Sequence, residues 1–569
     1  MNAPISHTPT AEQSAILDFA RGSKENLIIH ALAGAAKTST LVLIAKKLAS
    51  TGILCLAFNV RIKDEMKARL PGNCESLTLN GIGHRTWAKA LGRQPIVDSD
   101  KVYNIVKGLV EALPKGEIQL AAYEQMSDII RAVRSGKTSG WVPDGHFDFA
   151  KGLINDDEFF ASLDEEPTDL MIDLVTEASV ISARMALDGK IDYDDQLLMP
   201  TCFFGNFPSY PVTMTDESQD LSELNHVMLK KIVRNNRLFA VGDENQSIYA
   251  FRGAHSQSMD LLRQSFSMHR MDLTISFRCP QAVVKEARTR APAMQWPEWA
   301  KPGEVQTLHK WATTHIEHDA VILCRNNAPI FAMAVRLLKA GRYPQIVGSD
   351  IGKALVKIMQ KLGPEATPRE QAYELVNEWV AAKEVKSRDL HKVHDQAECM
   401  KVFIEQGATL GEAVAYAQHL MAVSGPLKMM TGHKSKGLEF PNVYILDRKL
   451  CNMERGQDRN LLYVMQTRAP QHLRGRVVGV MGSLAYAAGP LGLVLAGPLA
   501  DAAVAGEEEV VDDLVDVGVV GGEGGVDRRA RAGGHDPRAE AVDGGDGGGV
   551  ELGQCVEHLD RTLVRRYRC

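Results

Sequence analysis

The stretch NLIIHALAGAAKTSTLVLIAKKLAS, residues 26–50, carries the strongest indication of the fold. The apolar run at 26–32 favours a buried strand, and the segment from Thr38 onward has the spacing of a helix. Between them lies LAGAAKTS, which is similar to the phosphate-loop pattern GxxxxGK[ST]. Leu32 stands near the first glycine position and Ala36 replaces the last, so an alanine-rich helix start is the alternative interpretation.

The residues that remain from that pattern, Gly34, Lys37 and Thr38, are the ones that phosphate chemistry uses. Backbone N–H groups at a helix N-terminus cradle phosphate, the lysine reaches the β and γ oxygens, and the hydroxyl binds Mg²⁺. A second segment, TMTDESQD (213–220), places the carboxylates of Asp216 and Glu217 directly after a strand. Such a pair can hold Mg²⁺ and deprotonate the attacking water, so its position after a phosphate loop favours catalysis over a solvated charge pair.

Further apolar runs rich in β-branched residues predict strands at 53–58, 211–216 and 237–243. They alternate with helical stretches, which predicts an α/β fold with parallel sheets. The pattern becomes helical and polar between roughly 91 and 185 and again between roughly 350 and 425. We interpret both regions as mainly helical insertions into an α/β core.

A resemblance to a known family emerges at VGDENQSIYAFRGA (241–254), which together with DESQD resembles motifs II and III of superfamily 1 helicases of the UvrD/Rep/PcrA type. The resemblance extends over residues 1–470, with Asn80 where a histidine is usual and Phe277 where a tyrosine is usual. The other matching segments, in chain order, are PTAEQSAIL (9–17), CLAFNVRIKDEMKARL (55–70), SLTLNGIGHRTW (76–87), IDYDDQLLMP (191–200), LTISFRCP (273–280), MMTGHKSKGLEFPNVYIL (429–446) and DRNLLYVMQTRA (458–469).

The resemblance implies two RecA-like P-loop domains with parallel sheets, each carrying a mainly helical insertion, and ATP bound between them. The domain boundaries that it implies are 1–90 and 186–275 for domain 1A, 91–185 for insertion 1B, 276–349 and 426–470 for domain 2A, 350–425 for a small insertion 2B, and 471–569 for an unrelated low-complexity tail.

The same resemblance implies roles at the nucleotide. Gln13 would read the adenine, Phe277 would stack on it, and Glu439 would touch the ribose or phosphates. Thr38 and Asp216 would hold Mg²⁺, and Glu217 would be the base. Gln246 would sense the γ-phosphate from the first domain, and Arg278 and Arg468 would reach it from the second. The predicted catalytic residues are thus Lys37, Asp216, Glu217, Gln246, Arg278 and Arg468. The predicted nucleotide-binding residues are Gln13, Ala33, Gly34, Ala35, Ala36, Lys37, Thr38, Ser39, Phe277 and Glu439.

The DNA-facing residues also follow from the resemblance. Aromatic rings grip single strands by stacking on the bases without reading sequence. Core packing of alternate strand residues is the competing interpretation for the aromatic pair after Gln246, and a packed loop residue is the competing interpretation for the histidine of TGHKSKG. The predicted DNA-binding residues are Phe58, Asn59, Thr78, Tyr249, Phe251, Arg252 and His433.

Composition sets the wider limits. A chain of 569 residues predicts three or four domains, and 45% hydrophobic with 24% charged residues excludes a collagen-like chain, a coiled-coil rod and disorder throughout. The nine cysteines contain no CxxC pair, which argues against a zinc ribbon or a disulfide framework. The first residues show no secretory pattern, so we expect a cytoplasmic protein.

The last 99 residues differ from the rest in composition. They hold no Lys, Ile, Phe, Asn or Trp but 20 of the 48 glycines, and they carry 10 basic and 16 acidic residues, whereas the first 470 carry 55 of each. The uncharged run 477–500 resembles a fragment of a major-facilitator transporter and is long enough for a membrane helix, although five glycines and two prolines weaken it. We expect a fusion or frameshift scar without a role in catalysis, and a membrane-attached tail is the alternative.

The resemblance implies an ATP- and Mg²⁺-dependent DNA helicase or translocase, moving 3′ to 5′ on single-stranded DNA and acting at single-strand/double-strand junctions in repair, recombination or replication. No specific protein partner follows from the sequence, and a membrane is a partner only if the tail is genuine. Because the resemblance ends at Ala469, we expect the second sheet to lack its final strand. The alternative function is therefore a catalytically impaired nucleic-acid-binding protein.

Overall fold

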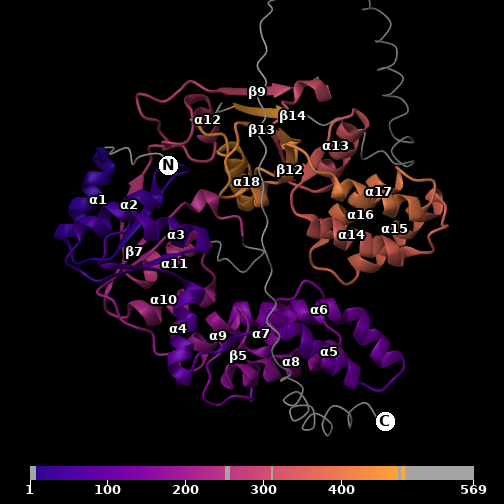
Figure 1. Ribbon diagram of the computed structural model, residues 1–569, viewed down its shortest axis with the longest axis horizontal. Coiled ribbons are helices and arrows are strands. Elements are labelled where there is room, and N and C mark those ends of the chain that lie inside the picture. The colour runs from indigo at the N-terminus through magenta and orange to yellow at the C-terminus, as the bar shows by residue number, and fades with distance from the viewer. Residues whose placement is uncertain (1–7, 250–256, 309–311, 472–475, 481–569) are drawn as a thin grey trace, which may run out of the picture. The chain divides into compact units, whose positions relative to one another are not determined.

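The computed structural model describes residues 8–249, 257–308, 312–471 and 476–480 (Figure 1). Two six-stranded sheets organise this part of the chain, and every pair of neighbouring strands in them is parallel. The expected α/β class with parallel sheets and helical insertions is confirmed.

The first sheet has the strand order β3-β2-β6-β7-β1-β8. The strands predicted at 26–32, 53–58, 211–216 and 237–243 are all present, as β1, β2, β6 and β7. The bounds are β1 Leu27–Ala31, β2 Ile53–Ala57, β3 Cys74–Thr78, β6 Val212–Thr215, β7 Arg237–Gly242 and β8 His269–Leu273.

Helices cover both faces of this sheet, so its inner strands β2, β6, β7 and β1 are buried on both sides. Ile29 faces one cluster together with Ile16 and Leu41, whereas its neighbour Ile28 faces another with Leu229 and Leu262. Alternation along a strand sends successive side chains to opposite faces, which explains the unbroken apolar runs in the sequence. The helices are α1 Ala11–Gly22, α2 Lys37–Lys47, α3 Val60–Arg69, α4 Leu79–Leu91, α10 Glu223–Val233 and α11 Ser258–Ser265.

The first insertion is helical, as expected, and carries a short two-stranded ladder of β4 with β5. Lys101 and Asp195 form a fully buried ion pair, and Lys137 bonds Asp192 and lies 2.8 Å from the second Asp195 oxygen. Removing one partner would leave a buried charge uncompensated, so this cluster ties the long helices to α9. The bounds are β4 Ile96–Val97, α5 Lys101–Ala112, α6 Glu117–Ser139, α7 Asp156–Ala161, α8 Asp169–Leu187, β5 Lys190–Ile191 and α9 Asp195–Cys202.

The second sheet has the order β11-β12-β10-β13-β14-β9, and this order corrects one expectation. The sheet does not lack a strand after Ala469, because Arg476–Val480 forms β14 between β13 and β9, with five paired positions on each side. The compositionally distinct tail therefore begins inside the folded domain. The other bounds are β9 Glu304–Leu308, β10 Val321–Cys324, β11 Pro344–Ile346, β12 Leu427–Thr431 and β13 Asn442–Leu446.

Strand β14 buries Val477 and Val478 on opposite faces of the sheet. Val477 packs in the cluster that contains Leu461, and Val478 packs on the opposite face, in the cluster of Tyr444 and Phe331. The Arg476 guanidinium pairs with Glu304 at 3.0 Å, and also pairs with Glu317. Val477 and Val478 are apolar and β-branched, so the segment RVVGV can form a strand inside the sheet although its composition resembles the tail. The flanking helices are α12 Gln281–Ala287, α13 Ala328–Lys339 and α18 Gly456–Gln466.

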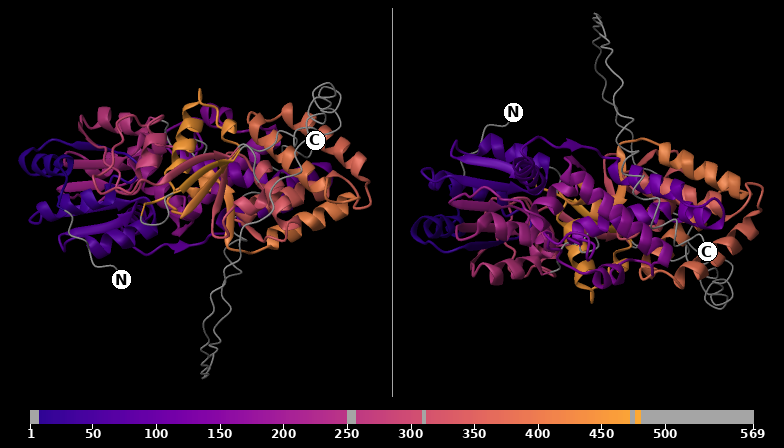
Figure 2. Two further views of the ribbon diagram at one scale, coloured as in Figure 1. Left: turned by 90° about the horizontal axis from the view of Figure 1, so that it is seen from above. Right: turned by 90° about the horizontal axis from the view of Figure 1, so that it is seen from below.

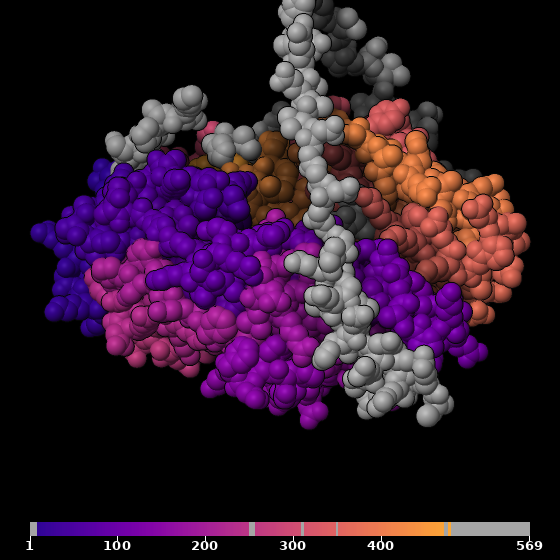
Figure 3. All heavy atoms as spheres, turned by 60° about the horizontal axis from the view of Figure 1, so that its bottom comes forward, coloured from indigo at the N-terminus to yellow at the C-terminus, as the bar shows by residue number. Residues whose placement is uncertain are grey.

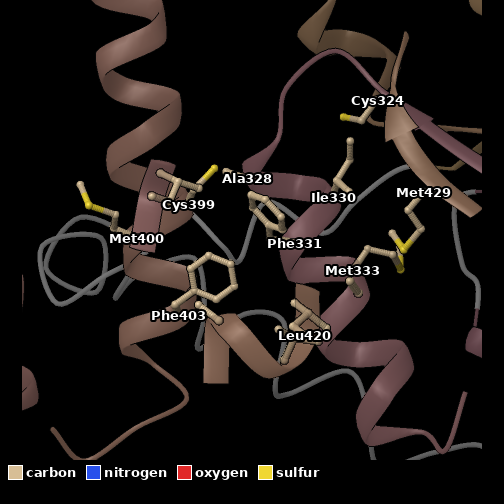
Figure 4. Close-up of a cluster of buried hydrophobic side chains, with 14 of the residues drawn as sticks. Cys324, Ala328, Ile330, Phe331, Met333, Cys399, Met400, Phe403, Leu420 and Met429 are labelled. Carbon is tan, nitrogen blue, oxygen red and sulfur yellow. The ribbon is translucent and has the colours of Figure 1, made fainter. Parts of the chain in front are cut away.

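The second insertion is a group of four helices packed on α13, and Figure 4 shows Phe331 of α13 facing Phe403 of α16 in their shared core. It also touches the first insertion, with Glu165 and Ser387 forming an antiparallel bridge and Lys383 pairing with Glu165 at 2.8 Å. Figures 2 and 3 show the two groups of helices side by side. The bounds are α14 Ser349–Leu362, α15 Arg369–Glu384, α16 Leu390–Ile404 and α17 Leu410–Ala422.

Within the described ranges, no helix is long and apolar enough to span a bilayer. Of the run 477–500, in which we considered a membrane helix, residues 477–480 belong to β14 and the remainder lies outside the described residues.

Candidate nucleotide site

The predicted catalytic residues of the first domain gather at the carboxyl edge of its sheet. The phosphate loop follows β1 and leads into α2 at Lys37, while Asp216 and Glu217 follow β6. Gln246 lies in the short helix after β7, which is the strand between β1 and β6. Parallel strands end at one edge, so residues distant in the sequence meet there.

The loop reaches its shape through left-handed backbone at two positions. Gly34 has φ of +75°, and Ala36, the N-cap of α2, has φ 59° and ψ 40°. A Cβ on Gly34 would lie 2.4 Å from the Cβ of Arg278, so glycine is required there by space as well as by φ. Ala36 holds a conformation that costs an L-residue about 1–2 kcal/mol. The loop therefore keeps phosphate-loop geometry despite the missing glycine.

This strain yields a testable expectation. Ala36→Gly should raise the free energy of unfolding by up to about 1 kcal/mol, because relief of the left-handed strain exceeds the added entropy of the unfolded chain. Ala35→Gly is the matched control, since Ala35 is not among the residues with positive φ and should lose stability on substitution. Urea unfolding of the three chains measures both. Equal destabilisation by the two substitutions would contradict the strained loop geometry.

Four side chains meet where phosphate and metal are expected. The Lys37 ammonium lies 2.8 Å from Glu217 Oε2, and the Thr38 hydroxyl donates to Asp216 Oδ2 at 2.7 Å. Burial disfavours the Lys37 charge, but Glu217 and Asp216 outweigh it and raise the pKa of Lys37. Burial and the neighbouring Glu217 raise the pKa of Asp216. This site concentrates charge and holds the hydroxyl and the carboxylate beside each other, as a Mg²⁺ site shared with phosphates requires.

The predicted adenine reader, Gln13, is buried at the start of α1. Its backbone N–H donates to Thr10 Oγ1 in a capping box, and its Nε2 donates to Thr40 Oγ1 at 3.0 Å. The bond to Thr40 holds the Gln13 side-chain amide against α2. Two residues of the loop also form hydrogen bonds: the Ala35 N–H donates to Leu32 O, and the Ser39 hydroxyl accepts from Arg69.

The second domain brings its predicted residues to the same place. The Phe277 N–H donates to Gly34 O at 2.9 Å, so the loop after β8 lies on the phosphate loop. Arg278 pairs with Glu439 at 2.7 Å. Arg468, 1% exposed, donates to Gln246 Oε1 at 3.4 Å, and burial followed by repulsion from Arg278 lowers its pKa to about 10.

Two contacts between the sheets involve residues to which sequence reasoning assigned no role. The Tyr463 hydroxyl accepts from the Ala33 N–H at 2.9 Å and lies 3.4 Å from Asp243 Oδ2. Asp243 in turn accepts from Gln246 Nε2 at 2.6 Å. Tyr463 and Asp243 stand inside the motifs quoted above, so the motif match was the available signal. A tyrosine in an apolar helix otherwise reads as core.

Lys436 connects the nucleotide site with the predicted DNA side. Its ammonium bonds Asp220 at 2.6 Å and Gln246 O at 2.7 Å, and lies 4.8 Å from the centre of the Tyr249 ring. Tyr249 itself donates to His433 O at 3.4 Å. One cation thus touches the segment after the acidic pair, the segment after β7 and an aromatic ring predicted to stack on DNA.

The other predicted DNA-binding residues are partly engaged in the fold. Asn59 and Thr78 cap α3 and α4, accepting from Ile62 N and Gly81 N, so both have a structural task besides any contact with DNA. The Phe58 ring is 45% exposed directly after β2. Phe58 and Asn59 follow β2 and Thr78 ends β3, at the same edge of the sheet as the phosphate loop. The predicted residues Phe251 and Arg252 lie outside the described residues.

No group of three or more His, Cys, Asp or Glu side chains suited to a metal ion occurs among the residues that the structure describes. The donor set around Thr38 and Asp216 fits Mg²⁺, which usually takes one or two protein ligands and completes its shell with phosphate oxygens and water.

Comparisons with known proteins find similarity to helicases. Residues 153–267 match the UvrD/REP helicase N-terminal domain, and residues 426–474 match the UvrD-like helicase C-terminal domain. The chain is 24% identical over 405 residues to the probable DNA helicase II homolog of Mycoplasma pneumoniae, covering 60% of this chain and 54% of that protein. It is 25% identical over 535 residues to F-box DNA helicase 1 of Gallus gallus, covering 82% and 48%. The chain therefore spans about half the length of these two relatives.

A separate short match concerns a transporter. Over 41 residues the chain is 95% identical to the multidrug efflux pump Tap of Mycolicibacterium fortuitum, which is 7% of this chain and 10% of the pump. This agrees with the transporter-like fragment inferred from the sequence.

Proposed function

We propose that this chain is a UvrD-type helicase of superfamily 1, an ATP-dependent DNA helicase that moves 3′ to 5′ on single-stranded DNA. The observation that best supports the activity is the meeting of Lys37, Glu217, Gln246, Arg278 and Arg468 around one loop. The first domain supplies Lys37 with the acidic pair and the second supplies two arginines, which suits phosphoryl transfer from a nucleotide bound between them.

In this proposal the residues divide the chemistry. The N–H groups at the start of α2 and the Lys37 ammonium bind the phosphates, and Glu217 orients and deprotonates water. Arg278 and Arg468 stabilise the charge that develops on the γ-phosphate. Mg²⁺, held by Thr38 and Asp216, would neutralise phosphate charge when bound. The phosphates of the nucleotide would compete with Glu217 for the Lys37 ammonium, since both need the same cation.

Movement on DNA would follow from the contacts between the sheets. The pair Arg468–Gln246 and the hydroxyl of Tyr463 join the two domains at the nucleotide, while Lys436 joins Gln246 to the Tyr249 ring. A change of nucleotide state that moves Gln246 would therefore also move Lys436 and the Tyr249 ring. Exchange of stacking contacts between two domain arrangements would advance the strand, preferentially from a single-strand/double-strand junction.

The alternative, an impaired nucleic-acid-binding protein, depended on a missing strand in the second sheet. Strand β14 occupies that position, so this premise no longer supports it. The experiment that separates the two is steady-state ATP hydrolysis without DNA, with a single-stranded oligonucleotide and with blunt duplex, in Mg²⁺ and in excess chelator. The helicase proposal expects hydrolysis that needs Mg²⁺ and rises with single strands, and strand displacement from substrates with a 3′ tail rather than a 5′ tail. ATP binding without stimulated hydrolysis would favour the alternative.

The stacking role of Tyr249 makes its own prediction. Tyr249→Ala should weaken binding of a short single-stranded oligonucleotide by about 5- to 150-fold, since base–aromatic stacking contributes about 1–3 kcal/mol per base. Tyr249→Phe keeps the ring and should bind nearly normally. Tyr343→Ala, which removes an exposed tyrosine of the second domain, is the control. Fluorescence anisotropy gives the affinities. If the unsubstituted chain and the three variants bind the oligonucleotide equally well, Tyr249 does not stack on DNA and serves only in packing.

A further inference from the structure

Gln471, the second residue after the last quoted motif, makes three hydrogen bonds beside the nucleotide site. Its backbone N–H donates to Arg278 O at 2.7 Å, its Nε2 donates to Phe277 O at 2.7 Å, and its Oε1 accepts from Lys301 N at 3.0 Å. The residue is 4% exposed. Both functional atoms of the side-chain amide are therefore used inside the fold.

The segment that Gln471 holds lies directly on the phosphate loop. Phe277 donates its N–H to Gly34 O, and the Ser276 hydroxyl donates to Ala33 O at 2.7 Å. The carbonyls of Phe277 and Arg278 are bound by Gln471. Hydrogen bonds thus hold both the N–H and the carbonyl of Phe277. They fix the backbone and with it the direction of the Phe277 and Arg278 side chains.

We propose that Gln471 is a positioning residue of the nucleotide site, which orients the Phe277 ring toward the base and the Arg278 guanidinium toward the γ-phosphate. The proposal rests on the function proposed above. It extends that function to a residue beyond the last quoted motif, at the start of the segment with the altered composition.

Glutamine suits this task because one planar amide supplies both a donor and an acceptor. Asparagine is one methylene shorter and could not span the distance between Phe277 O and Lys301 N from the same backbone position. Glutamate would keep the acceptor for Lys301 but would place an oxygen against Phe277 O. Gln471→Glu therefore breaks the bond to Phe277 selectively.

The chain offers a matched control in Gln281. Its Nε2 donates to Ala300 O at 2.8 Å and its backbone N–H donates to Lys301 O, so it holds the same 300–301 turn. It makes neither of the two bonds to the carbonyls of Phe277 and Arg278. Gln281→Met thus tests loss of support for the turn alone, and Gln471→Met tests loss of support for the nucleotide segment.

The experiment measures the affinity of each chain for a fluorescent ATP analogue and the KM and kcat of single-strand-stimulated hydrolysis. Gln471→Met and Gln471→Glu should both weaken nucleotide binding at least threefold through Phe277 and lower kcat at least tenfold through Arg278. Gln281→Met should stay within twofold of the unsubstituted chain. In a Phe277→Ala background, Gln471→Glu should no longer change nucleotide affinity, because the ring it positions is gone.

Three results would overturn the proposal. The first is an unchanged KM, kcat and affinity in both Gln471 variants, and the second is an undiminished effect of Gln471→Glu in the Phe277→Ala background. The third is a chain that binds no ATP at all. A chain that binds ATP but does not hydrolyse it would contradict the helicase proposal alone, since the affinity measurements would still test Gln471. If Gln471→Met fails to fold, Gln471→Glu retains the Lys301 bond and carries the test.

Discussion

Replacing Glu217 by glutamine should lower single-strand-stimulated ATP turnover by about 10²- to 10⁴-fold, the range ascribed to general-base catalysis, while ATP binding stays close to normal. Burial alone would raise the pKa of Glu217, but Lys37 and Lys436 lower it, so the carboxylate is ionised and able to accept a proton. The amide keeps the size and the bond from Gln219 but not the base. Rapid-quench hydrolysis and equilibrium ATP binding measure the two effects.

Lys37→Ala serves as the contrasting variant, because it removes the ammonium that binds phosphate rather than the base. It should abolish hydrolysis and weaken ATP binding, yet leave single-strand affinity largely intact, since the amine points at Glu217 and not toward Tyr249. A Glu217→Gln chain whose turnover falls less than about tenfold would show that another group is the base. Near-normal hydrolysis by Lys37→Ala would refute the phosphate-loop assignment.

Truncation after Pro470 should eliminate ATPase activity and leave the second sheet unfolded, whereas truncation after Gly482 should preserve both. The shorter chain loses β14, which pairs with β13 and β9 along its whole length. It also loses the burial of Val477 and Val478, worth together roughly 3–6 kcal/mol, and the bonds from Gln471. This loss is comparable with the whole stability of a typical domain. From composition alone, we would expect the cut after Pro470 to be harmless.

The control for this pair is a single substitution in the full chain. Val478→Asp would place a charge between the sheet and the cluster around Tyr444 and should reproduce the truncated behaviour, because a buried unpaired carboxylate is strongly unfavourable. Circular dichroism and limited proteolysis measure folding, and hydrolysis is compared at equal folded concentration. If the chain ending at Pro470 hydrolyses ATP as fast as the chain ending at Gly482, β14 is dispensable and the sheet tolerates its absence.

Local sequence was sufficient for four of the six strands of the first sheet, but not for the less buried strands β3 and β8. The strands at β1, β2, β6 and β7 follow from apolar runs because each is buried on both faces. The chemistry of Lys37, Thr38, Asp216 and Glu217 follows from their place after strands, since parallel strands deliver their ends to one edge. The assignment of Arg278 and Arg468 needed the family resemblance, because an isolated arginine in a loop or a helix carries no signal of a phosphate.

Contacts between residues far apart in the chain could not be predicted from the sequence. Tyr463, Asp243 and Lys436 acquire their contacts only because the two sheets approach each other. Their partners lie hundreds of positions away, as with Ala33 and Tyr463. Composition was misleading at residues 471–480. Five residues that include three valines can complete a parallel ladder, because strand formation depends on burial and register and not on the origin of the sequence.

The sequence by itself determined that this is an α/β protein with a phosphate loop, an acidic pair after a strand and an ordered set of UvrD-type motifs, because period, spacing and residue type are local properties. Only the tertiary structure decided that β14 closes the second sheet, that Gln471 holds Phe277 and Arg278, and that Lys436 joins the nucleotide site to Tyr249. Those features depend on which surfaces are buried against each other. Burial and hydrogen bonding between distant segments depend on the packing of the whole domain. They produce no local pattern in the sequence from which they could be predicted.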